Sequence, residues 1–194
     1  MKKLILVTSP PASGKTYVSK ALAKEIYNIV YLDKDSLIPL SKRVFYVAGE
    51  EYNRSSDFFY ENIRDAEYEA IVGIAFEALA YADTVLINAP FTREIRDSEY
   101  ISSLKERLSE LSAELLAVWV QTDAAVCKRR MEERKSERDK WKLENWDKYI
   151  MTQDFSIPDT LGDSLFVFRN SSTEEFEESM TALTEKLKKE QPSS

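Results

Sequence analysis

The pattern of apolar and polar positions divides this chain into short β-rich runs separated by stretches with helical periodicity. Apolar residues recur at helical spacing in those stretches, and the longest is predicted to be one helix over residues 57–82. The predicted strands are residues 3–8, 29–32, 84–88, 115–121 and 164–169. Strands that alternate with helices in this way specify an α/β fold with a parallel sheet.

Three apolar stripes mark the faces on which the predicted helices pack. They consist of Phe59, Ile63, Ala66, Ala70, Ile71, Ile74, Ala78 and Leu79; of Ile101, Leu104, Leu108 and Leu111; and of Phe176, Met180, Leu183 and Leu187. The third helix is opened by a capping box formed by Ser172 and Glu175. A charge-dense helical hairpin over about 124–150 interrupts the alternation before the last strand. We therefore expect a single domain over residues 1–190, with this hairpin as a lid and residues 191–194 as a frayed tail.

Composition narrows the chemistry that this domain can perform. The chain has 194 residues with a net charge of −7, which argues against broad electrostatic attraction to nucleic acid or acidic membranes. It contains no histidine and a single cysteine, which effectively excludes zinc chemistry, histidine-based triads and a disulfide framework. That cysteine, Cys127, is expected to be a buried thiol. The apolar runs are too short for a signal peptide or a membrane span, so a cytoplasmic location is expected.

The segment Ser-Pro-Pro-Ala-Ser-Gly-Lys-Thr at 9–16 lies between the first predicted strand and an amphipathic helix. In this setting, backbone N–H groups and the helix N-terminus bind phosphates, Lys15 reaches the β- and γ-phosphates, and the Thr16 hydroxyl ligates Mg²⁺. A chance turn is the alternative, but the placement favours a nucleotide site. The candidate nucleotide-binding residues are Pro11, Ala12, Ser13, Gly14, Lys15, Thr16 and Tyr17. Ser9 and Ala12 replace glycines usual in such loops, at a cost of about 1 kcal/mol for either that needs a positive φ.

Two carboxylates follow the second predicted strand, where ligands bind in open α/β sheets. Asp35 is a candidate to orient a hydroxyl acceptor and take its proton, and Asp33 is a candidate for the Mg²⁺ shell. Asn88, at the end of the third strand, stands where many phosphate-loop proteins carry a metal-binding aspartate, which strengthens the case for Asp33. The alternative is a solvated turn in which Asp35 caps a helix that begins at Ser36.

Arginines recur every four residues in the predicted lid, at Arg130, Arg134 and Arg138, and therefore share one helix face. Such a face would neutralise charge on a transferring phosphoryl group when the lid closes. A solvated face, with Glu133 and Glu137 as partners, is the alternative. Arg130 and Arg134 are the stronger candidates.

For two other sets of residues, the sequence does not distinguish a binding role from a structural role. Arg93 and Arg96 lie one turn apart and would either bind an anionic acceptor or be exposed. The segment 43–60 is rich in aromatic residues, some of which would wall an acceptor pocket together with Arg43 and Arg54.

The loop at 10–16, the strand end Leu-Asp-Lys-Asp at 32–35 and the Arg-Met-Glu-Glu-Arg segment at 130–134 together resemble the small P-loop kinases of the polynucleotide kinase, shikimate/gluconate kinase, chloramphenicol phosphotransferase and zeta-toxin group. The resemblance spans most of the chain, although only the loop is specific as a motif. It implies a P-loop NTPase three-layer sandwich, in which a five-stranded parallel sheet has helices on both faces and a helical lid. The sequence departs from the pattern of this group at three positions. Ser9 and Ala12 affect the geometry of the loop, and Asn88 affects the outer coordination shell of the metal.

The resemblance also implies roles for individual residues. Lys15 contacts the β- and γ-phosphates and Thr16 the metal, Asp35 matches the acceptor-activating aspartate, and Asp33 matches the first member of the Asp-x-Asp pair of the shikimate kinase branch. Arg130 and Arg134 match the lid arginines. Asn170 falls near the region that contacts adenine.

The expected function is that of an ATP- and Mg²⁺-dependent phosphotransferase acting on a hydroxyl of a small molecule. A nucleotide-sugar kinase, a polynucleotide kinase and a regulatory ATPase or switch without a small-molecule acceptor are the alternatives. The acidic balance disfavours the polynucleotide substrate. Asn88 in place of a metal-binding aspartate disfavours the switch. No nucleic-acid or membrane partner is expected.

Overall fold

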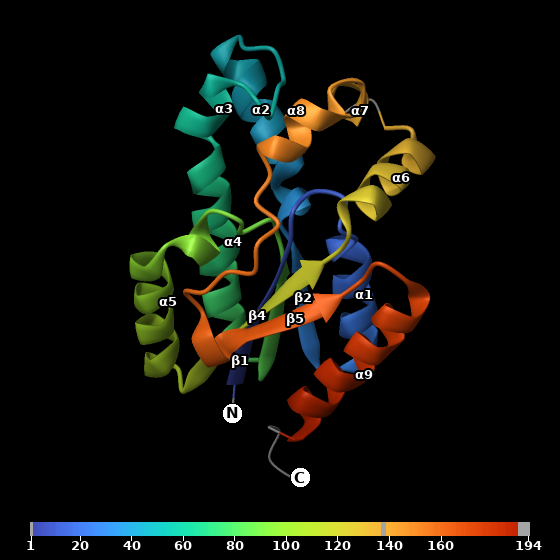
Figure 1. The fold of residues 1–194 in the computed structure, drawn as a ribbon. Helices are drawn as coiled ribbons and strands as arrows, with labels where there is room; N and C mark the ends of the chain where they lie inside the picture. Colours follow the sequence, from blue (N-terminus) through green and yellow to red (C-terminus); the bar gives the residue numbers. More distant parts are fainter. Residues whose placement is uncertain (1, 137–138, 190–194) are drawn as a thin grey trace.

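The computed structural model describes residues 2–136 and 139–189, and its centre is a five-stranded parallel sheet (Figure 1). The strand order is β2-β3-β1-β4-β5. The strands are β1 (Lys2–Thr8), β2 (Ile29–Asp33), β3 (Thr84–Asn88), β4 (Ala113–Gln121) and β5 (Leu165–Arg169). All five strands predicted from the sequence are confirmed, with boundaries that differ by two residues at most.

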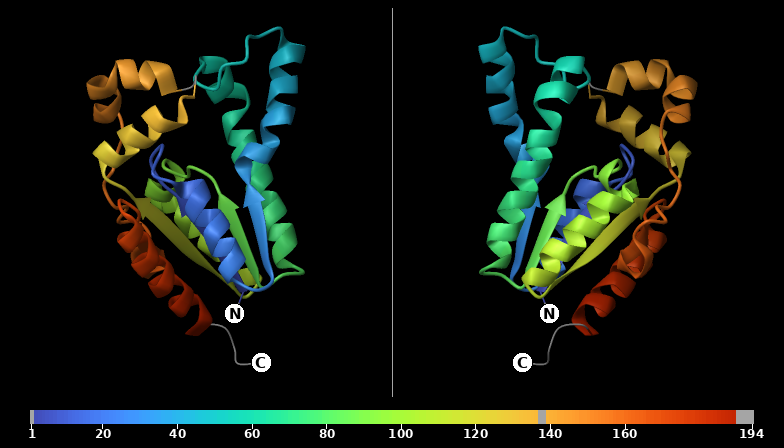
Figure 2. Two further views of the ribbon diagram at one scale, coloured as in Figure 1. Left: turned by 90° about the vertical axis from the view of Figure 1, so that its right-hand side faces the viewer. Right: turned by 90° about the vertical axis from the view of Figure 1, so that its left-hand side faces the viewer.

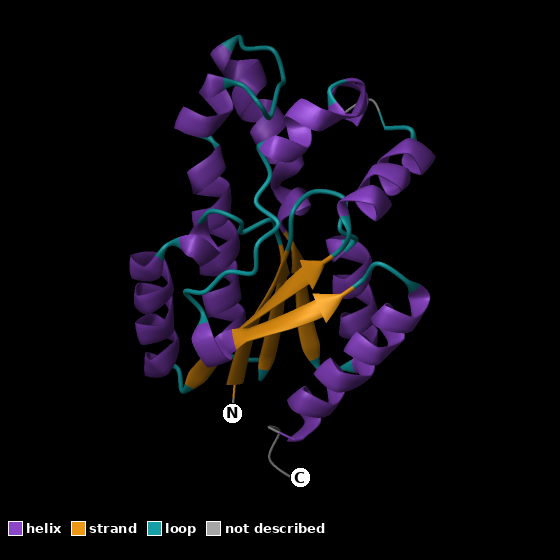
Figure 3. Cartoon of the chain, in the orientation of Figure 1, coloured by secondary structure: helices purple, strands orange, loops and turns teal. Residues whose placement is uncertain are grey.

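Helices connect the strands and form the ends of the molecule (Figure 3). The α-helices are α1 (Lys15–Glu25), α2 (Ile38–Ala48), α3 (Asp57–Asn62), α4 (Arg64–Leu79), α5 (Ser98–Glu110), α6 (Ala124–Arg134), α7 (Lys140–Glu144), α8 (Trp146–Met151) and α9 (Thr173–Lys189). The 3-10 turns that can be given full bounds within the described residues are η1 (Lys34–Leu37), η2 (Glu94–Arg96) and η4 (Gly162–Ser164). The predicted capping box forms in part: Ser172 Oγ accepts a hydrogen bond from the backbone N–H of Glu175 at 3.2 Å, but the Glu175 carboxylate accepts from the N–H of Ser171, at 2.7 Å, and not from that of Ser172.

Alternate residues of the central strand face the two sides of the sheet, as strand geometry requires. Leu4 and Leu6 pack against α4 and α5, whereas Ile5 and Val7 pack against α1 and α9. These two fully buried clusters give the expected three layers (Figure 2). The remaining helices, α2 and α3 on one side and α6 to α8 on the other, rise above the carboxyl ends of the strands.

In this strand order the phosphate-loop strand β1 and strand β2 are not direct neighbours. Strand β3 lies between them, and Asn88 pairs in register with Val7 on one side and with Asp33 on the other. The ends of three strands therefore meet around Asn88.

The helix predicted over 57–82 is two helices, α3 and α4, that meet at Ile63. The buried face of α4 also differs from the predicted stripe, since Ala66, Ala70 and Ile74 are exposed while Glu67 is buried. Glu67 interrupts the apolar periodicity of the helix. It can be buried because Lys34 and Arg54, which are distant in the sequence, form ion pairs with its carboxylate.

The predicted lid hairpin consists of the three short helices α6, α7 and α8. Helix α6 ends at Arg134, and Lys135 takes a left-handed conformation with φ of 47°. Arg138, Glu137 and the predicted frayed tail at 191–194 lie outside the described residues. Among the described helices, none is both long and apolar enough to cross a bilayer.

Candidate functional site

The sequence-predicted site residues surround a cavity of about 640 Å³ at the carboxyl ends of the strands. Its walls come from the phosphate loop and the start of α1, from the end of β2 and the start of η1, and from α6 and α7. Its lining residues are Ser9, Pro10, Pro11, Ala12, Ser13, Gly14, Lys15, Thr16, Tyr17, Asp33, Lys34, Asp35, Arg54, Pro90, Arg130, Arg134 and Lys142. Of the predicted nucleotide, metal and catalytic residues, only Asn170 is missing from this wall.

Two residues of the phosphate loop adopt left-handed backbone conformations. Gly14 has φ of 87° and Ala12 has φ of 65°, whereas Ser9 does not take a positive φ. The expected cost of a missing glycine therefore applies at Ala12 and not at Ser9. Ser13 stabilises the turn by donating from its hydroxyl to the Pro10 carbonyl at 3.0 Å.

The carbonyl oxygen of Ser13 accepts hydrogen bonds from three side chains that belong to three distant segments. Asn170 donates at 2.7 Å, Thr122 at 2.9 Å and Arg130 at 3.2 Å. A Cβ at Gly14 would lie 2.4 Å from Asn170 Nδ2, so the close approach of Asn170 requires glycine there. Asn170 is therefore buried against the phosphate loop. The sequence analysis expected it near adenine and did not predict this contact with the loop.

Cys127 lies beneath the same loop and is fully buried, as expected. Its sulfur is 3.8 Å from Ser13 Oγ. Burial raises the pKa of the thiol despite the hydrogen bond with Ser13. A neutral, inaccessible thiol is a packing group and not a nucleophile.

Asn88 connects the two predicted metal-binding residues. Its Nδ2 lies 3.2 Å from Thr16 Oγ1 and 3.0 Å from Asp33 Oδ2. The other oxygen of Asp33 accepts from the backbone N–H of Asp35 at 3.0 Å and caps η1. The capping role that the sequence analysis considered for Asp35 is thus wrong, because the turn begins at Lys34 and its cap is Asp33.

These oxygens fit the ligand preferences of Mg²⁺, which binds hydroxyl and carboxylate oxygens and keeps several waters. Asn88 Oδ1 is buried and has no hydrogen-bond partner among the described residues, so it is available to a metal-bound water. The described residues hold no group of three or more acidic, histidine or cysteine side chains that would bind a metal alone. A divalent ion here would depend on Thr16, Asp33 and oxygens of a bound nucleotide.

Asp35 is exposed and lines the cavity. Its backbone is held by the Asp33 carboxylate, which also accepts a hydrogen bond from the Tyr31 hydroxyl at 3.0 Å. Burial, with the Asp33 charge, raises the pKa of Tyr31 to about 12. Tyr31 therefore remains a neutral donor that orients Asp33 at physiological pH.

A buried glutamate below Asp35 is the residue that sequence reasoning missed. Glu67 accepts hydrogen bonds from Lys34 at 2.6 Å, from both terminal nitrogens of Arg54 at 2.6 Å, and from Ser41. Burial alone would raise the pKa of Glu67, but the donors hold it at about 2. The sequence did contain a signal for this site, because Glu67 is a charged residue within the predicted apolar stripe of its helix. Glu67 fixes Lys34 and Arg54 at the wall of the cavity.

The two predicted lid arginines occupy different environments. Arg130 donates to the carbonyls of Ser13 at 3.2 Å and Asn170 at 2.8 Å, so it secures the phosphate loop. Arg134 binds the fully buried Asp139 in a bidentate ion pair, with one contact of 2.7 Å. Lys142 lies 3.6 Å from the same carboxylate. Asp139 thereby holds two cations of the lid at the edge of the cavity.

Neither arginine after β3 lines this cavity. Arg96 binds Ser156 and Asp154 and secures the segment before η4, while Arg93 is exposed beside η2. In the aromatic segment, Phe45 and Phe59 are buried in a small core, Arg43 stacks on the exposed Tyr46, and only Arg54 reaches the cavity.

Comparisons with known proteins agree with this architecture. A structure from Chloroflexus aurantiacus, described as a kinase on a provisional basis, has a TM-score of 0.68 at 19% identity and covers 98% of this chain and 99% of its own. A gluconokinase from Sinorhizobium meliloti has a TM-score of 0.53 at 15% identity, with 98% of each chain covered. A shikimate kinase from Bacteroides thetaiotaomicron has a TM-score of 0.52 at 15% identity, covering 96% of this chain and 98% of its own. No curated protein matches the sequence.

At these identities the solved structures establish the shared fold, which is the P-loop α/β fold expected from the sequence. The sequence itself matches a family over residues 4–155, a range that includes the phosphate loop, Asp33, Asp35, Asn88 and α6. The chain belongs to the AAA domain family.

Proposed function

We propose that this protein is a kinase that transfers the γ-phosphoryl group of ATP to a hydroxyl of a small molecule. The observation that carries the proposal is the placement of Asp35 in the same cavity as Lys15 and Thr16. A phosphoryl-transfer site needs a carboxylate near the acceptor hydroxyl and cations near the phosphates. A nucleotide switch has no need of the exposed Asp35.

Each residue has one role in this proposal. Lys15 and the loop amides bind the phosphates, and Asp35 orients the acceptor hydroxyl and accepts its proton. Mg²⁺, when bound through Thr16 and the shell around Asp33, neutralises charge on the phosphate oxygens. Arg134 and Lys142 supply positive charge from the lid, while Arg130 keeps the loop in its binding conformation.

The lining of the site and the similar solved structures support a choice of the acceptor class to test first. Tyr17, Arg54 and Lys34 line the cavity with polar groups, and the similar solved structures include a gluconokinase and a shikimate kinase. Both names describe small hydroxylated acids. A small polyhydroxylated acid is therefore the first acceptor to test for this chain. The proposal also includes that the chain is a member of the small P-loop kinase group that its sequence resembles.

The test is transfer of label from γ-labelled ATP, with Mg²⁺, to a panel of sugar acids, shikimate, sugars, nucleosides, nucleotide sugars, aminoglycosides, chloramphenicol and short oligonucleotides. Lys15→Met and Asp35→Asn are the active-site variants, and Asp57→Asn, an exposed aspartate at the start of α3, is the matched control. We expect Asp35→Asn to lower kcat by about a hundredfold or more with unchanged ATP affinity.

Full transfer activity in Asp35→Asn would contradict the assigned role. ATP binding and slow hydrolysis, with no transfer to any acceptor, would favour a regulatory ATPase. Transfer to oligonucleotides alone would identify a polynucleotide kinase.

A further inference from the structure

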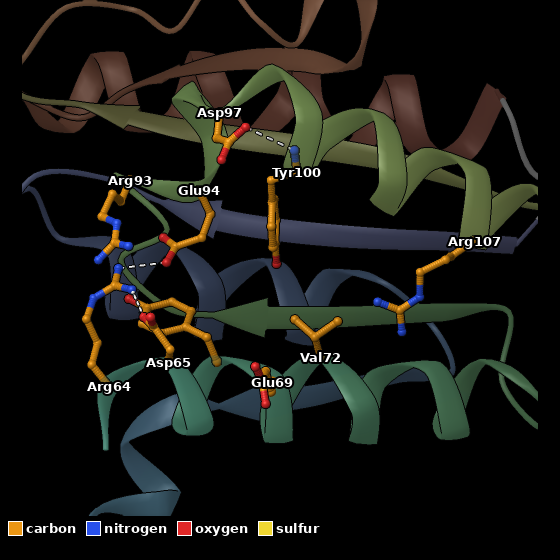
Figure 4. Close-up of a pocket in the computed structure, with 10 residues that line it drawn as sticks. Arg64, Asp65, Glu69, Val72, Arg93, Glu94, Asp97, Tyr100 and Arg107 are labelled. Carbon is orange, nitrogen blue, oxygen red and sulfur yellow. Dashed lines mark hydrogen bonds and ion pairs between the residues drawn. The ribbon is translucent and has the colours of Figure 1, made fainter. Parts of the chain in front are cut away.

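A second cavity, of about 510 Å³, lies between α4, η2 and α5 (Figure 4). It is separate from the phosphate-loop cavity, because the two have no lining residue in common. Its walls consist of Arg64, Asp65, Tyr68, Glu69, Val72, Arg93, Glu94, Asp97, Tyr100 and Arg107. The lining part of α4, from Arg64 to Val72, spans about 12 Å along the helix axis.

One polar atom in this wall is buried without a partner. The Glu94 side chain is only 10% exposed, and one of its oxygens accepts from Arg64 Nη2 at 2.7 Å. The other oxygen, Oε2, has no hydrogen bond among the described residues. A buried carboxylate oxygen without a donor costs stability, and a donor from a ligand would remove that cost.

The aromatic walls of the cavity are held in place. The Tyr68 hydroxyl donates to the Pro90 carbonyl at 2.8 Å, and the Arg64 guanidinium lies 4.5 Å from the centre of its ring. Tyr100 extends from the start of α5 into the middle of the cavity (Figure 4). Burial, followed by the charge of Glu94, raises the pKa of Tyr100 to about 12, so its hydroxyl stays neutral.

Charge differs between the two ends. Two arginines and three carboxylates line one end of the cavity, which leaves that end with one excess negative charge: Arg64, whose guanidinium is shared between Asp65 and Glu94, together with Arg93 and Asp97. At the opposite end in Figure 4, the Arg107 guanidinium lies 4.2 Å from the centre of the Phe76 ring. Arg107 has no ion pair with any described residue. One end is thus suited to a cation with N–H donors, and the other to an anion.

We propose that this cavity binds a small zwitterion, whose ammonium group donates to Glu94 Oε2 and whose anionic group pairs with Arg107. The ammonium neutralises the excess negative charge of this end of the cavity while it supplies Glu94 Oε2 with the missing donor. The aliphatic part of the ligand lies along Val72 and the Tyr100 ring. This site does not depend on the kinase proposal, since it uses none of the residues of the phosphate-loop cavity.

Three six-carbon probes separate the two charges: 6-aminohexanoate carries both, hexylamine only the cation, and hexanoate only the anion. Binding is measured by titration of ¹⁵N-labelled protein, following the backbone amides of Glu94, Tyr100 and Arg107 by NMR, with probe up to about 50 mM. We expect saturable shifts with 6-aminohexanoate, weaker binding of hexylamine and the weakest binding of hexanoate.

The variants are Glu94→Gln, which keeps the acceptor for Arg64, and Arg107→Met, which keeps the contact with Phe76. We expect each to weaken 6-aminohexanoate about tenfold, and Arg107→Met to leave hexylamine unchanged. Glu99→Gln and Arg129→Met, at exposed positions outside the cavity, are the matched controls. Thermal unfolding of each variant checks its fold, and Arg107→Met tests the site even if Glu94→Gln is unstable.

Three outcomes overturn the proposal. One is the absence of saturable shifts at the cavity amides with every probe. Another is binding of 6-aminohexanoate that neither variant weakens. The third is hexylamine binding as tightly as 6-aminohexanoate, because Arg107 would then hold no anion.

Discussion

The side-chain amide of Asn170 donates a hydrogen bond of 2.7 Å to the carbonyl oxygen of Ser13, although 157 positions separate the two residues in the chain. The contact joins the end of β5 to the phosphate loop. It is possible only because Gly14 has no Cβ, which would lie 2.4 Å from the Asn170 nitrogen. The geometry of the loop therefore depends on the other end of the molecule.

Replacing Asn170 with alanine should loosen the phosphate loop. One of the three donors to Ser13 is lost, so we expect a decrease of about 1 kcal/mol in the free energy of unfolding, together with weaker ATP binding. Denaturant unfolding and fluorescence titration with a nucleotide analogue measure the two effects. Asn62→Ala, at an exposed amide of α3, is the control. If Asn170 only contacts adenine, the unfolding of the nucleotide-free protein will not change.

Replacing Ala12 with glycine should stabilise the protein. Ala12 has φ of 65°, a conformation that costs an L-residue about 1 kcal/mol and glycine almost nothing. We expect Ala12→Gly to raise the free energy of unfolding by about 0.5 to 1 kcal/mol. The matched control is Ala21→Gly inside α1, which should lower it by about 1 kcal/mol. A loss of stability in both variants would show that Ala12 makes contacts that outweigh its strain.

The ion pairs of Glu67 should make stability depend on acid pH. Its pKa is lowered from about 4.5 to about 2 in the folded protein, so folding favours the charged carboxylate. The resulting stabilisation is complete above pH 4.5 and is lost as the pH falls through 2. Chemical unfolding measured between these pH values should show the decrease.

Glu67→Gln tests the assignment of that decrease. The variant should lack the part of the acid-induced decrease in stability that is due to Glu67. At pH 7 its free energy of unfolding should be lower by about 3 kcal/mol, because Lys34 and Arg54 lose their carboxylate partner. Glu77→Gln, at an exposed site of the same helix, should keep both the pH dependence and the stability. A wild-type slope in Glu67→Gln would assign the acid sensitivity to other carboxylates.

Asp139 should limit the affinity of the lid for phosphates. It is fully buried and neutralises Arg134 and Lys142, which line the phosphate-loop cavity. Asp139→Asn should tighten ATP binding about fivefold, equivalent to about 1 kcal/mol, and lower the stability of the lid. Calorimetric titration with ATP measures the first effect and hydrogen exchange of α6 to α8 the second. Asp147→Asn, exposed on α8, is the control, and equal ATP affinity in all three proteins would exclude this role.

Much of the fold could be predicted from the order of the residues alone. The third strand was predicted at residues 84–88 and observed there, and the loop at 9–16 was correctly placed between a strand and a helix. These features follow from periodicity and from turn chemistry, which are properties of neighbouring residues. The structure places three of the candidate site residues, Asp35, Lys15 and Thr16, around one cavity.

Local signals failed where a partner comes from a distant segment. Glu67 interrupts an apolar stripe, and only Lys34 and Arg54, brought to it by the fold, explain its burial. Only the tertiary structure shows that Asp33 and not Asp35 caps η1, and that Asn88 of the neighbouring strand contacts Asp33.

What the sequence by itself determined is thus the set of strands, their alternation with helices and the chemical identity of the phosphate loop. The strand order, the partner of each buried charge and the second cavity beside α5 were decided by the tertiary structure. The physical reason is that backbone periodicity is set by the nearest neighbours along the chain. Hydrogen bonds and ion pairs between distant residues exist only once the sheet has assembled and brought their segments together.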